Sequence, residues 1–169
     1  MDVYLVERET GEKHLATILP ALKKDMPLRK HGWQFNWKAL SKIKNSLLYK
    51  IVLDNDESKL QGMLMLTLVD NEMLFMDNVE VAPHNFGREE KYSYVAGCLI
   101  AFASKMSFEL GKGNYVGFLV FESKTALIEL YQQRYGAEIA MGQRMFIDDV
   151  AGKKLIKTYL GIDMDDLEQ

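Results

Sequence analysis

The sequence has 169 residues, of which 48% are hydrophobic and 27% are charged. A chain of this length can bury a sizeable core but is too short for two domains of ordinary size. Its composition is typical of globular proteins and excludes the disordered and fibrous classes. We therefore expect one domain over residues 1–160, followed by an acidic and frayed tail over residues 161–169.

Charge and cysteine content bear on partners and location. The net charge of −3 comes from 24 acidic and 21 basic residues that are interspersed along the chain. Because there is no polybasic segment, and no apolar run approaches the ~18 residues of a membrane span, we expect neither nucleic acid nor a membrane as a partner. The single cysteine, Cys98, cannot form an internal disulfide, so we expect the protein in the cytoplasm.

The first half of the chain predicts a strand, a helix and a meander. Residues 3–8 are rich in Val and Tyr and predict a short strand, whereas residues 12–24 carry Leu and Ile at helical spacing and predict a helix. An irregular segment with several aromatic residues follows at residues 28–46 and is called the aromatic segment below. Polar turns then separate three apolar runs, which predict an antiparallel meander over residues 47–53, 60–69 and 73–81.

The second half predicts helices that alternate with strands. Apolar residues at helical spacing predict a long helix over residues 95–110. An apolar run at residues 115–121 and a second helical pattern at residues 124–135 predict a strand followed by a helix. The chain then predicts a hairpin around Gly142 and a short amphipathic helix over residues 151–160.

The segment at residues 73–111 has the pattern around which the rest of the chain is organised. It predicts a buried strand, a polar loop and a long apolar helix, with no second strand between them. A helix N-terminus carries roughly +0.5 of an elementary charge and several unpaired N–H groups, so a turn that delivers one is suited to binding phosphate. In this chain the turn that leads into the predicted helix is residues 91–97.

This segment resembles the strand, loop and helix of the GNAT superfamily, the acyl-CoA-dependent N-acetyltransferases. The family pattern is an apolar strand with Val-x-Pro, then Arg/Gln-x-x-Gly-x-Gly/Ala, then a helix. The positions that match it are Val79, Val81, Pro83, Lys91 and Ala96. Tyr94 stands where the family has Gly, and the loop before Lys91 is longer than usual, so the chain looks like an atypical and unassigned branch.

The resemblance implies a mixed α/β fold with a central mixed sheet of about six or seven strands and helices on both faces. It also implies an acyltransferase that moves an acetyl group from acetyl-CoA to a primary amine by direct attack, with acetyl-CoA as co-substrate and no metal. The acceptor stays unassigned. The residues expected at the cofactor are Val79, Val81, Arg88, Lys91, Tyr92, Tyr94, Val95, Ala96 and Gly97.

Acid and base candidates follow from the same resemblance. The family has a Tyr on the helix after the fifth strand, and Tyr131 fits that position as the acid that protonates the leaving thiolate. As an alternative, Tyr131 and Tyr135 are core aromatics on one helix face. Glu80 is the first candidate for the base and Asp77 the second, although alternation puts them on opposite faces of an unbroken strand. Either carboxylate could instead be paired with a basic residue.

The acceptor side is expected near the first aromatic segment and the loop after Pro83. The candidate residues there are Trp33, Phe35, Trp37, His84 and Asn85. As an alternative, the last two only cap the loop.

Two other classes of function compete with the enzyme. One is a non-catalytic GNAT-like domain that senses acyl-CoA or acts as a protein-interaction module, and the other is a scaffold that uses exposed aromatics near Trp33. For the enzyme we expect a small-molecule or peptide amine as partner, no nucleic acid, no membrane, and a monomer or homodimer.

Overall fold

The structure is a computed structural model that describes residues 1–167. It divides into two compact units, of which the first comprises Met1–Met65 and Asn78–Leu99 and the second comprises Leu66–Asp77 and the chain from Ile100 onward. The single domain over residues 1–160 stays a prediction. In the acidic tail Met164–Leu167 forms helix α5, and residues 168–169 lie outside the described residues.

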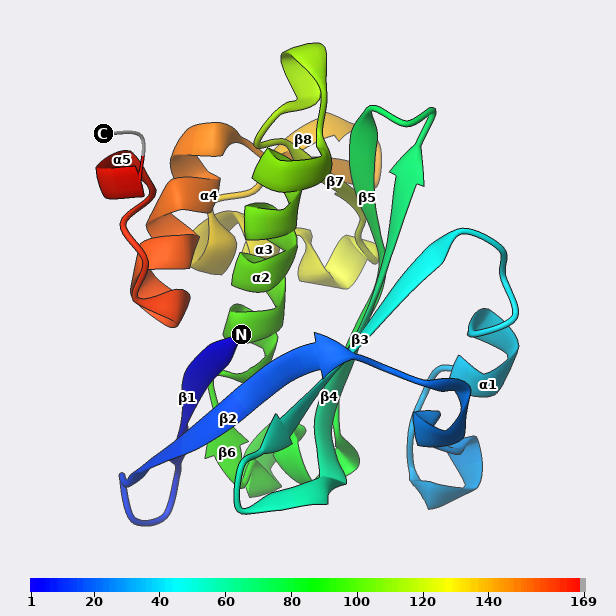
Figure 1. Cartoon of the computed structure of the whole chain (residues 1–169), viewed down its shortest axis with the longest axis vertical. Coiled ribbons are helices and arrows are strands. Elements are labelled where there is room, and N and C mark those ends of the chain that lie inside the picture. The colour runs from blue at the N-terminus through cyan, green and yellow to red at the C-terminus, as the bar shows by residue number, and fades with distance from the viewer. Residues whose placement is uncertain (168–169) are drawn as a thin grey trace. The chain divides into compact units, whose positions relative to one another are not determined.

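The described residues form one mixed sheet of nine strands, in the order β6-β1-β2-β3-β4-β5-β7-β9-β8 (Figure 1). The fold class is thus confirmed, with more strands than the six or seven expected. The strands are β1 (Asp2–Glu7), β2 (Lys13–Pro20), β3 (Ser46–Leu53), β4 (Asp56–Val69), β5 (Met73–Val81), β6 (Tyr92–Ser93), β7 (Leu119–Glu122), β8 (Glu138–Met141) and β9 (Arg144–Ile147).

Five α-helices are present among residues 1–167. They are α1 (Trp37–Leu40), α2 (Val95–Leu110), α3 (Ile128–Tyr135), α4 (Asp149–Leu155) and α5, and α4 continues into a π-helical turn at Ile156–Leu160. The predicted long helix, the predicted helix before Gly136 and the hairpin around Gly142 are confirmed. None of these helices combines the length and the apolar character that a membrane span requires.

Residues 12–24 do not form the helix that the sequence predicts. Most of them form β2, which pairs antiparallel with β1 and β3. Ala16 and Ile18 are buried while the intervening and flanking side chains are more exposed, so the segment follows the period of two of a strand. The Leu and Ile spacing fits either period over so short a stretch, and pairing with two neighbouring strands decides between them.

The loop before α2 contains a short strand that the sequence did not predict. Tyr92–Ser93 forms β6, which pairs antiparallel with the end of β1. The backbone N–H of Arg8 also donates to the carbonyl of Lys91, at 2.9 Å. Two residues are too few to show a periodic pattern, so only the pairing identifies this strand.

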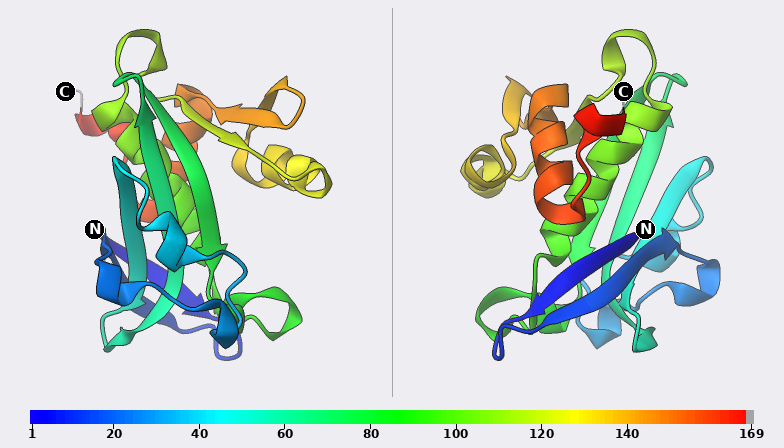
Figure 2. Two further views of the ribbon diagram at one scale, coloured as in Figure 1. Left: turned by 90° about the vertical axis from the view of Figure 1, so that its right-hand side faces the viewer. Right: turned by 60° about the vertical axis from the view of Figure 1, so that its left-hand side comes forward.

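In the second unit, β5 and β7 form a parallel pair, with Leu74 opposite Leu119 and Met76 opposite Phe121. β7 pairs in turn with β9, which forms the hairpin with β8. Helix α4 lies beside α2 in both views of Figure 2. The two helices are in contact at Gly152, where an added Cβ would lie 3.5 Å from the Cβ of Ser104, an ordinary van der Waals distance.

Candidate functional site

Helix α2 begins at Val95, directly after a residue with an unusual backbone. Tyr94 has a φ of +75°, and its carbonyl accepts the hydrogen bond of the Cys98 N–H at 2.9 Å. The N–H groups of the first turn, Val95 to Gly97, have no acceptor within the helix and lie at its positive end. The turn therefore has the properties of an anion-binding helix N-terminus.

The backbone of Tyr94 adopts the conformation that glycine favours. The left-handed region is costly for a residue with a Cβ, which explains why a family motif would have Gly at this position. The Tyr94 side chain is 53% exposed. The departure from the motif therefore changes the side chain at this position and leaves the backbone turn in place.

Gly62, in β4, allows the start of α2 to approach the sheet closely. A Cβ added at Gly62, in β4, would lie 2.9 Å from Cγ1 of Val95, 3.0 Å from Cδ1 of Leu99 and 3.1 Å from the carbonyl oxygen of Glu80. Such contacts leave no room for a side chain, so Gly62 positions the helix start. Sequence analysis missed this residue, although a glycine inside an apolar strand is a recognisable signal of close approach.

The loop between β5 and α2 is held by buried amide groups. Asn85 is 4% exposed, and its Nδ2 donates to the carbonyl of Gln61 at 3.1 Å and to Oε1 of Gln61 at 3.0 Å. Its Oδ1 accepts the backbone N–H of Tyr92 at 3.0 Å. These contacts favour the loop-capping role over a substrate contact for Asn85, because all of its amide atoms already have partners in the protein.

Glu80 is engaged in hydrogen bonds with the aromatic segment. Its carboxylate accepts the backbone N–H of Gln34 at 2.6 Å, the backbone N–H of Phe35 at 3.2 Å and Nε1–H of Trp37 at 2.8 Å. A carboxylate with three donors holds this segment against β5. The geometry therefore favours an anchoring role for Glu80, and its assignment as base stays a prediction.

The aromatic segment is buried. Trp37 is 0% exposed and Trp33 is 8% exposed, and both belong to a core cluster with Met63, Met65 and other apolar residues of the first unit. The expectation of exposed aromatics near Trp33 is wrong, because the indole rings supply the core of this unit. Phe35 packs at the edge of the cluster, 6.2 Å from the ring of Trp37. A contact between these residues and an acceptor stays a prediction.

Two other catalytic candidates lie in the second unit. The carboxylate of Asp77 accepts the hydroxyl of Thr67 at 2.7 Å, and partial desolvation raises its pKa. The ring of Tyr131 lies 4.9 Å from that of Phe121 and 5.7 Å from that of Tyr135, and burial raises the pKa of the Tyr131 phenol. Glu80 lies in the first unit, so the sequence-predicted acid and first-choice base belong to different units.

The predicted basic residues of the loop are exposed. The carbonyl of Arg88 accepts Nη1–H of Arg8 at 2.8 Å, which ties the loop to the end of β1. Nζ of Lys91 lies 5.5 Å from the centre of the Tyr92 ring. Val79 and Val81 are half-buried on β5.

A cavity of about 340 Å³ lies between the end of β1 and this loop. It is lined by Glu7, Glu9, His84, Glu89, Glu90 and Lys91. Four carboxylates give it a negative lining that repels phosphate and attracts cations. Sequence analysis did not bring these residues together, because the ends of β1 and of the loop are far apart in the chain.

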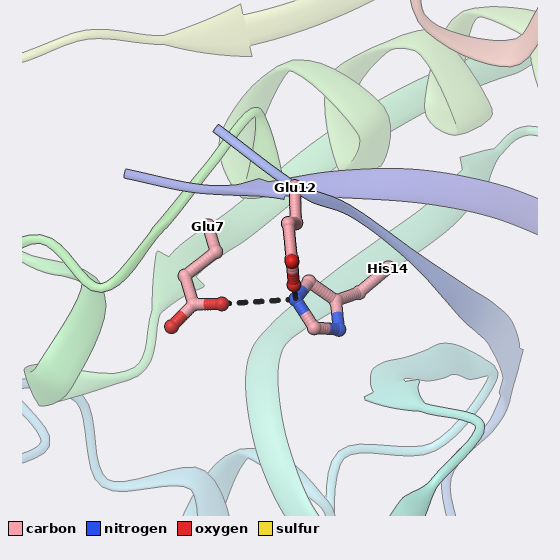
Figure 3. A group of neighbouring side chains, drawn as sticks. All are labelled: Glu7, Glu12 and His14. Carbon is pink, nitrogen blue, oxygen red and sulfur yellow. Dashed lines mark hydrogen bonds and ion pairs between the residues drawn. The ribbon is translucent and has the colours of Figure 1, made fainter. Parts of the chain in front are cut away.

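The β1–β2 hairpin carries a cluster of possible cation ligands. One ligand atom each from Glu7, Glu12 and His14 lies within 4.8 Å of the others (Figure 3). Nε2 of His14 is 3.0 Å from Oε2 of Glu7, which also accepts the hydroxyl of Thr10. The hydrogen bond between His14 and Glu7 accounts for the approach of these two side chains.

No protein-family model and no curated protein matches the sequence. Solved structures do resemble the chain. The KacTA–DNA complex contains a chain with a TM-score of 0.61 at 12% identity, over 85% of this chain and 99% of that chain. AtaTR bound with acetyl-CoA gives 0.60 at 13% identity, over 83% and 98% of the two chains. A GNAT family acetyltransferase from Elizabethkingia anophelis with acetyl-CoA bound gives 0.51 at 20% identity, over 75% and 78%.

At these identities the likeness is one of fold. The chain has the fold of the GNAT acetyltransferases, and the resemblance drawn from its sequence motifs is confirmed at that level.

The expectation about partners is wrong. It confined them to small-molecule or peptide amines and excluded nucleic acid, whereas proteins of this fold occur in a KacTA–DNA complex and in an AtaT–AtaR complex bound to DNA. The reasoning failed because the net charge of one chain does not describe an assembly in which a second chain can supply the basic surface.

We expect Tyr94→Gly to keep or raise the free energy of unfolding by up to about 1 kcal/mol, because relief of the left-handed strain offsets the added flexibility of glycine. Tyr94→Ala is the matched control, since it removes the ring but keeps the strain, and should give no gain. Urea unfolding of both variants measures the difference. A clear loss of stability for the glycine variant would contradict the assigned backbone strain.

Glu80→Gln should lower the free energy of unfolding by about 1–3 kcal/mol, because an amide cannot accept all three hydrogen bonds and leaves a donor unpaired. Glu57→Gln removes the same charge from an exposed position of β4 and should change stability by less than about 0.5 kcal/mol. Chemical denaturation compares the two. Equal midpoints would show that Glu80 does not anchor the aromatic segment.

Proposed function

We propose that this protein is an N-acetyltransferase that moves an acetyl group from acetyl-CoA to a primary amine by direct attack. The observation that carries the proposal is the start of α2, where a left-handed Tyr94 precedes a first helical turn whose N–H groups have no acceptor within the helix, in a chain with the GNAT fold. Structures of this fold with acetyl-CoA bound support the choice of co-substrate.

In this proposal the pyrophosphate of acetyl-CoA binds to the backbone of residues 94–97. Hydrogen bonds from the N–H groups and the helix dipole favour an anion there. Arg88 and Lys91 add positive charge. Tyr92 belongs to the same turn, and its ring lies beneath Nζ of Lys91. The backbone at Val79 and Val81 holds the pantetheine arm and the thioester, as the family resemblance implies.

Tyr131 is proposed as the acid for the leaving thiolate. Burial raises the pKa of its phenol above the ordinary value, so the hydroxyl keeps its proton throughout the neutral range. A group that stays protonated can donate to a thiolate whose ordinary pKa is about 8.5. Of the two carboxylates proposed as base, Asp77 has fewer protein partners than Glu80 and is the better candidate.

The acceptor amine is not restricted to small molecules in this proposal. AtaT and KacTA are found with antitoxin or DNA, so amines carried by proteins or by nucleoprotein complexes belong among the acceptors to be tested. Release of free CoA thiol identifies an acceptor among polyamines, aminoglycosides, peptide N-termini and macromolecular fractions.

A second candidate function has one observation in its favour. The carboxylates of the cavity beside the loop, among them Glu89 and Glu90, weaken the attraction of this region for phosphates. That favours a GNAT-like module without acetyl-CoA turnover, which acts by binding another protein. Measurement of acetyl-CoA binding distinguishes the two functions.

We expect acetyl-CoA to raise the stability of the protein, by about 2.7 kcal/mol at a concentration a hundredfold above the dissociation constant. Calorimetric titration and thermal unfolding measure this effect. Absence of both heat and a melting shift at millimolar acetyl-CoA would remove the enzyme proposal in favour of the module.

Ala96→Glu tests where the cofactor binds. A carboxylate in the first turn of α2 favours the helix but repels phosphate, so acetyl-CoA affinity should fall at least tenfold while the unliganded protein melts no lower. Asn114→Glu adds the same charge at an exposed position away from this turn and should bind acetyl-CoA as the parent does. Equal affinities for the two variants would contradict binding at the α2 N-terminus.

Tyr131→Phe should lower kcat roughly ten- to a thousandfold with little change in the KM for the amine, because protonation of the thiolate belongs to the transition state. Tyr135→Phe removes a hydroxyl one turn further along the same helix face and serves as the control, with kcat close to that of the parent. Steady-state kinetics with an identified acceptor decides. Similar rates for the parent and Tyr131→Phe would exclude the phenol as the acid.

A further inference from the structure

A chain of hydrogen bonds determines the tautomer of His84. The backbone N–H of Tyr92 can only donate, so the Asn85 atom that faces it is Oδ1 and the other amide atom is the donor Nδ2. Nδ2 faces Oε1 of Gln61 at 3.0 Å, which must therefore act as an acceptor. The same oxygen lies 2.7 Å from Nε2 of His84, so the proton of a neutral imidazole is on Nε2.

The second ring nitrogen is then available to accept a proton. In a neutral imidazole with its hydrogen on Nε2, Nδ1 carries a lone pair. Burial lowers the pKa of His84, and the positive charges of Lys59 and Lys91 lower it further, so the imidazole is neutral at pH 7. An imidazole of this kind has the properties of a general base at neutral pH.

His84 also lines the cavity that contains the carboxylates. Glu7 and Glu9 reach the cavity from β1 and the turn after it, and Glu89, Glu90 and Lys91 reach it from the loop. The carboxylates outnumber the lysine and favour an ammonium group as occupant. A primary amine is almost entirely protonated at neutral pH, so a base in this cavity would have a proton to remove.

The loop connects His84 to the start of α2. The backbone N–H of Lys91 donates to the carbonyl of His84 at 2.9 Å, and Lys91 precedes Tyr94 by three residues. Both the imidazole and the proposed phosphate-binding turn belong to the first unit. Glu80, the first-choice base from the sequence, is already bound to three donors of the aromatic segment.

We propose that His84 is the base that removes a proton from the ammonium group of the acceptor, with the cavity beside it as the acceptor site. The proposal rests on the acetyltransferase function proposed above, replaces its carboxylate base by His84 and adds an acceptor site. Asp77, which belongs to the second unit, is the rival base.

The chemistry balances with this assignment. Nδ1 of His84 takes one proton from the ammonium and later returns it to solvent, which leaves a neutral amine. The amine nitrogen forms a bond to the thioester carbonyl carbon, and the bond between that carbon and sulfur breaks. The nitrogen of the tetrahedral intermediate releases its second proton to solvent. The thiolate takes one proton, from Tyr131 in the proposed mechanism, and solvent then reprotonates the phenolate. The products are the acetylated amine and CoA thiol.

The tautomer can be tested without any activity. Nitrogen-15 NMR of imidazole-labelled protein should show Nδ1 of His84 without hydrogen at pH 7 and a titration midpoint below the ordinary value for histidine. Putrescine should perturb the His84 signals more than n-butylamine does, because it carries a second positive charge. A hydrogen on Nδ1 at pH 7 would overturn the proposal, whether or not the protein is an acetyltransferase.

Kinetics test the role of the base. His84→Gln keeps an N–H donor for Gln61 and removes the base, so kcat/KM near pH 7 should fall at least tenfold and approach the parent value as the pH nears the pKa of the amine. His31→Gln changes an exposed histidine and should behave as the parent does. His84→Ala should regain activity with added imidazole.

The outcomes separate the two proposals. If the parent binds no acetyl-CoA and acetylates no amine, the proposed function fails and the base assignment fails with it. If the parent is active and His84→Gln retains its pH profile while Asp77→Asn loses it, the function stands and the assignment of His84 is wrong.

Discussion

The buried side chain of Gln61 is the contact on which the start of α2 depends. The backbone carbonyl of Gln61 accepts the N–H of Ala82 at 2.9 Å and Nδ2–H of Asn85. The side-chain oxygen Oε1 accepts from Nδ2 of Asn85 and from Nε2 of His84. Gln61 is fully buried, and unsatisfied amide atoms at such a depth would cost about 1–3 kcal/mol each. The network therefore holds the loop after β5 in one arrangement. Gly62, the next residue, lets α2 approach the same point of β4.

Glu80 holds the aromatic segment against β5, as Gln61 holds the loop after β5. A lone carboxylate in an apolar strand would be costly to desolvate, and three donors from the aromatic segment compensate for that cost. The regular structure of the segment before β3 is limited to a 3-10 turn at Arg29–His31 and to α1. Its position is therefore determined by Glu80 and by the burial of the two tryptophans. Glu80, whose role as base stays a prediction, therefore also anchors the aromatic segment.

The neighbours of similar fold changed the view of function in one respect. They include a structure with acetyl-CoA bound, and they also include complexes with an antitoxin and with DNA. The distribution of charge along one chain does not predict which partners an assembly of several chains can bind. The acidic cavity and the N-terminus of α2 both lie in the first unit, and the proposed transfer from an anionic cofactor to a cationic acceptor needs both kinds of charge.

Local patterns in the sequence were sufficient for the meander, for α2, for the hairpin around Gly142 and for the strand–loop–helix motif that identifies the fold. Each of these depends on periodicity and turn residues within one short stretch. Other features required the tertiary structure, because they depend on residues that are distant in the chain. The segment before Pro20 becomes a strand only by pairing with two others, and Glu80 meets Trp37 across 43 residues. The left-handed turn at Tyr94 and the tautomer of His84 are set by neighbours that no periodic pattern reveals.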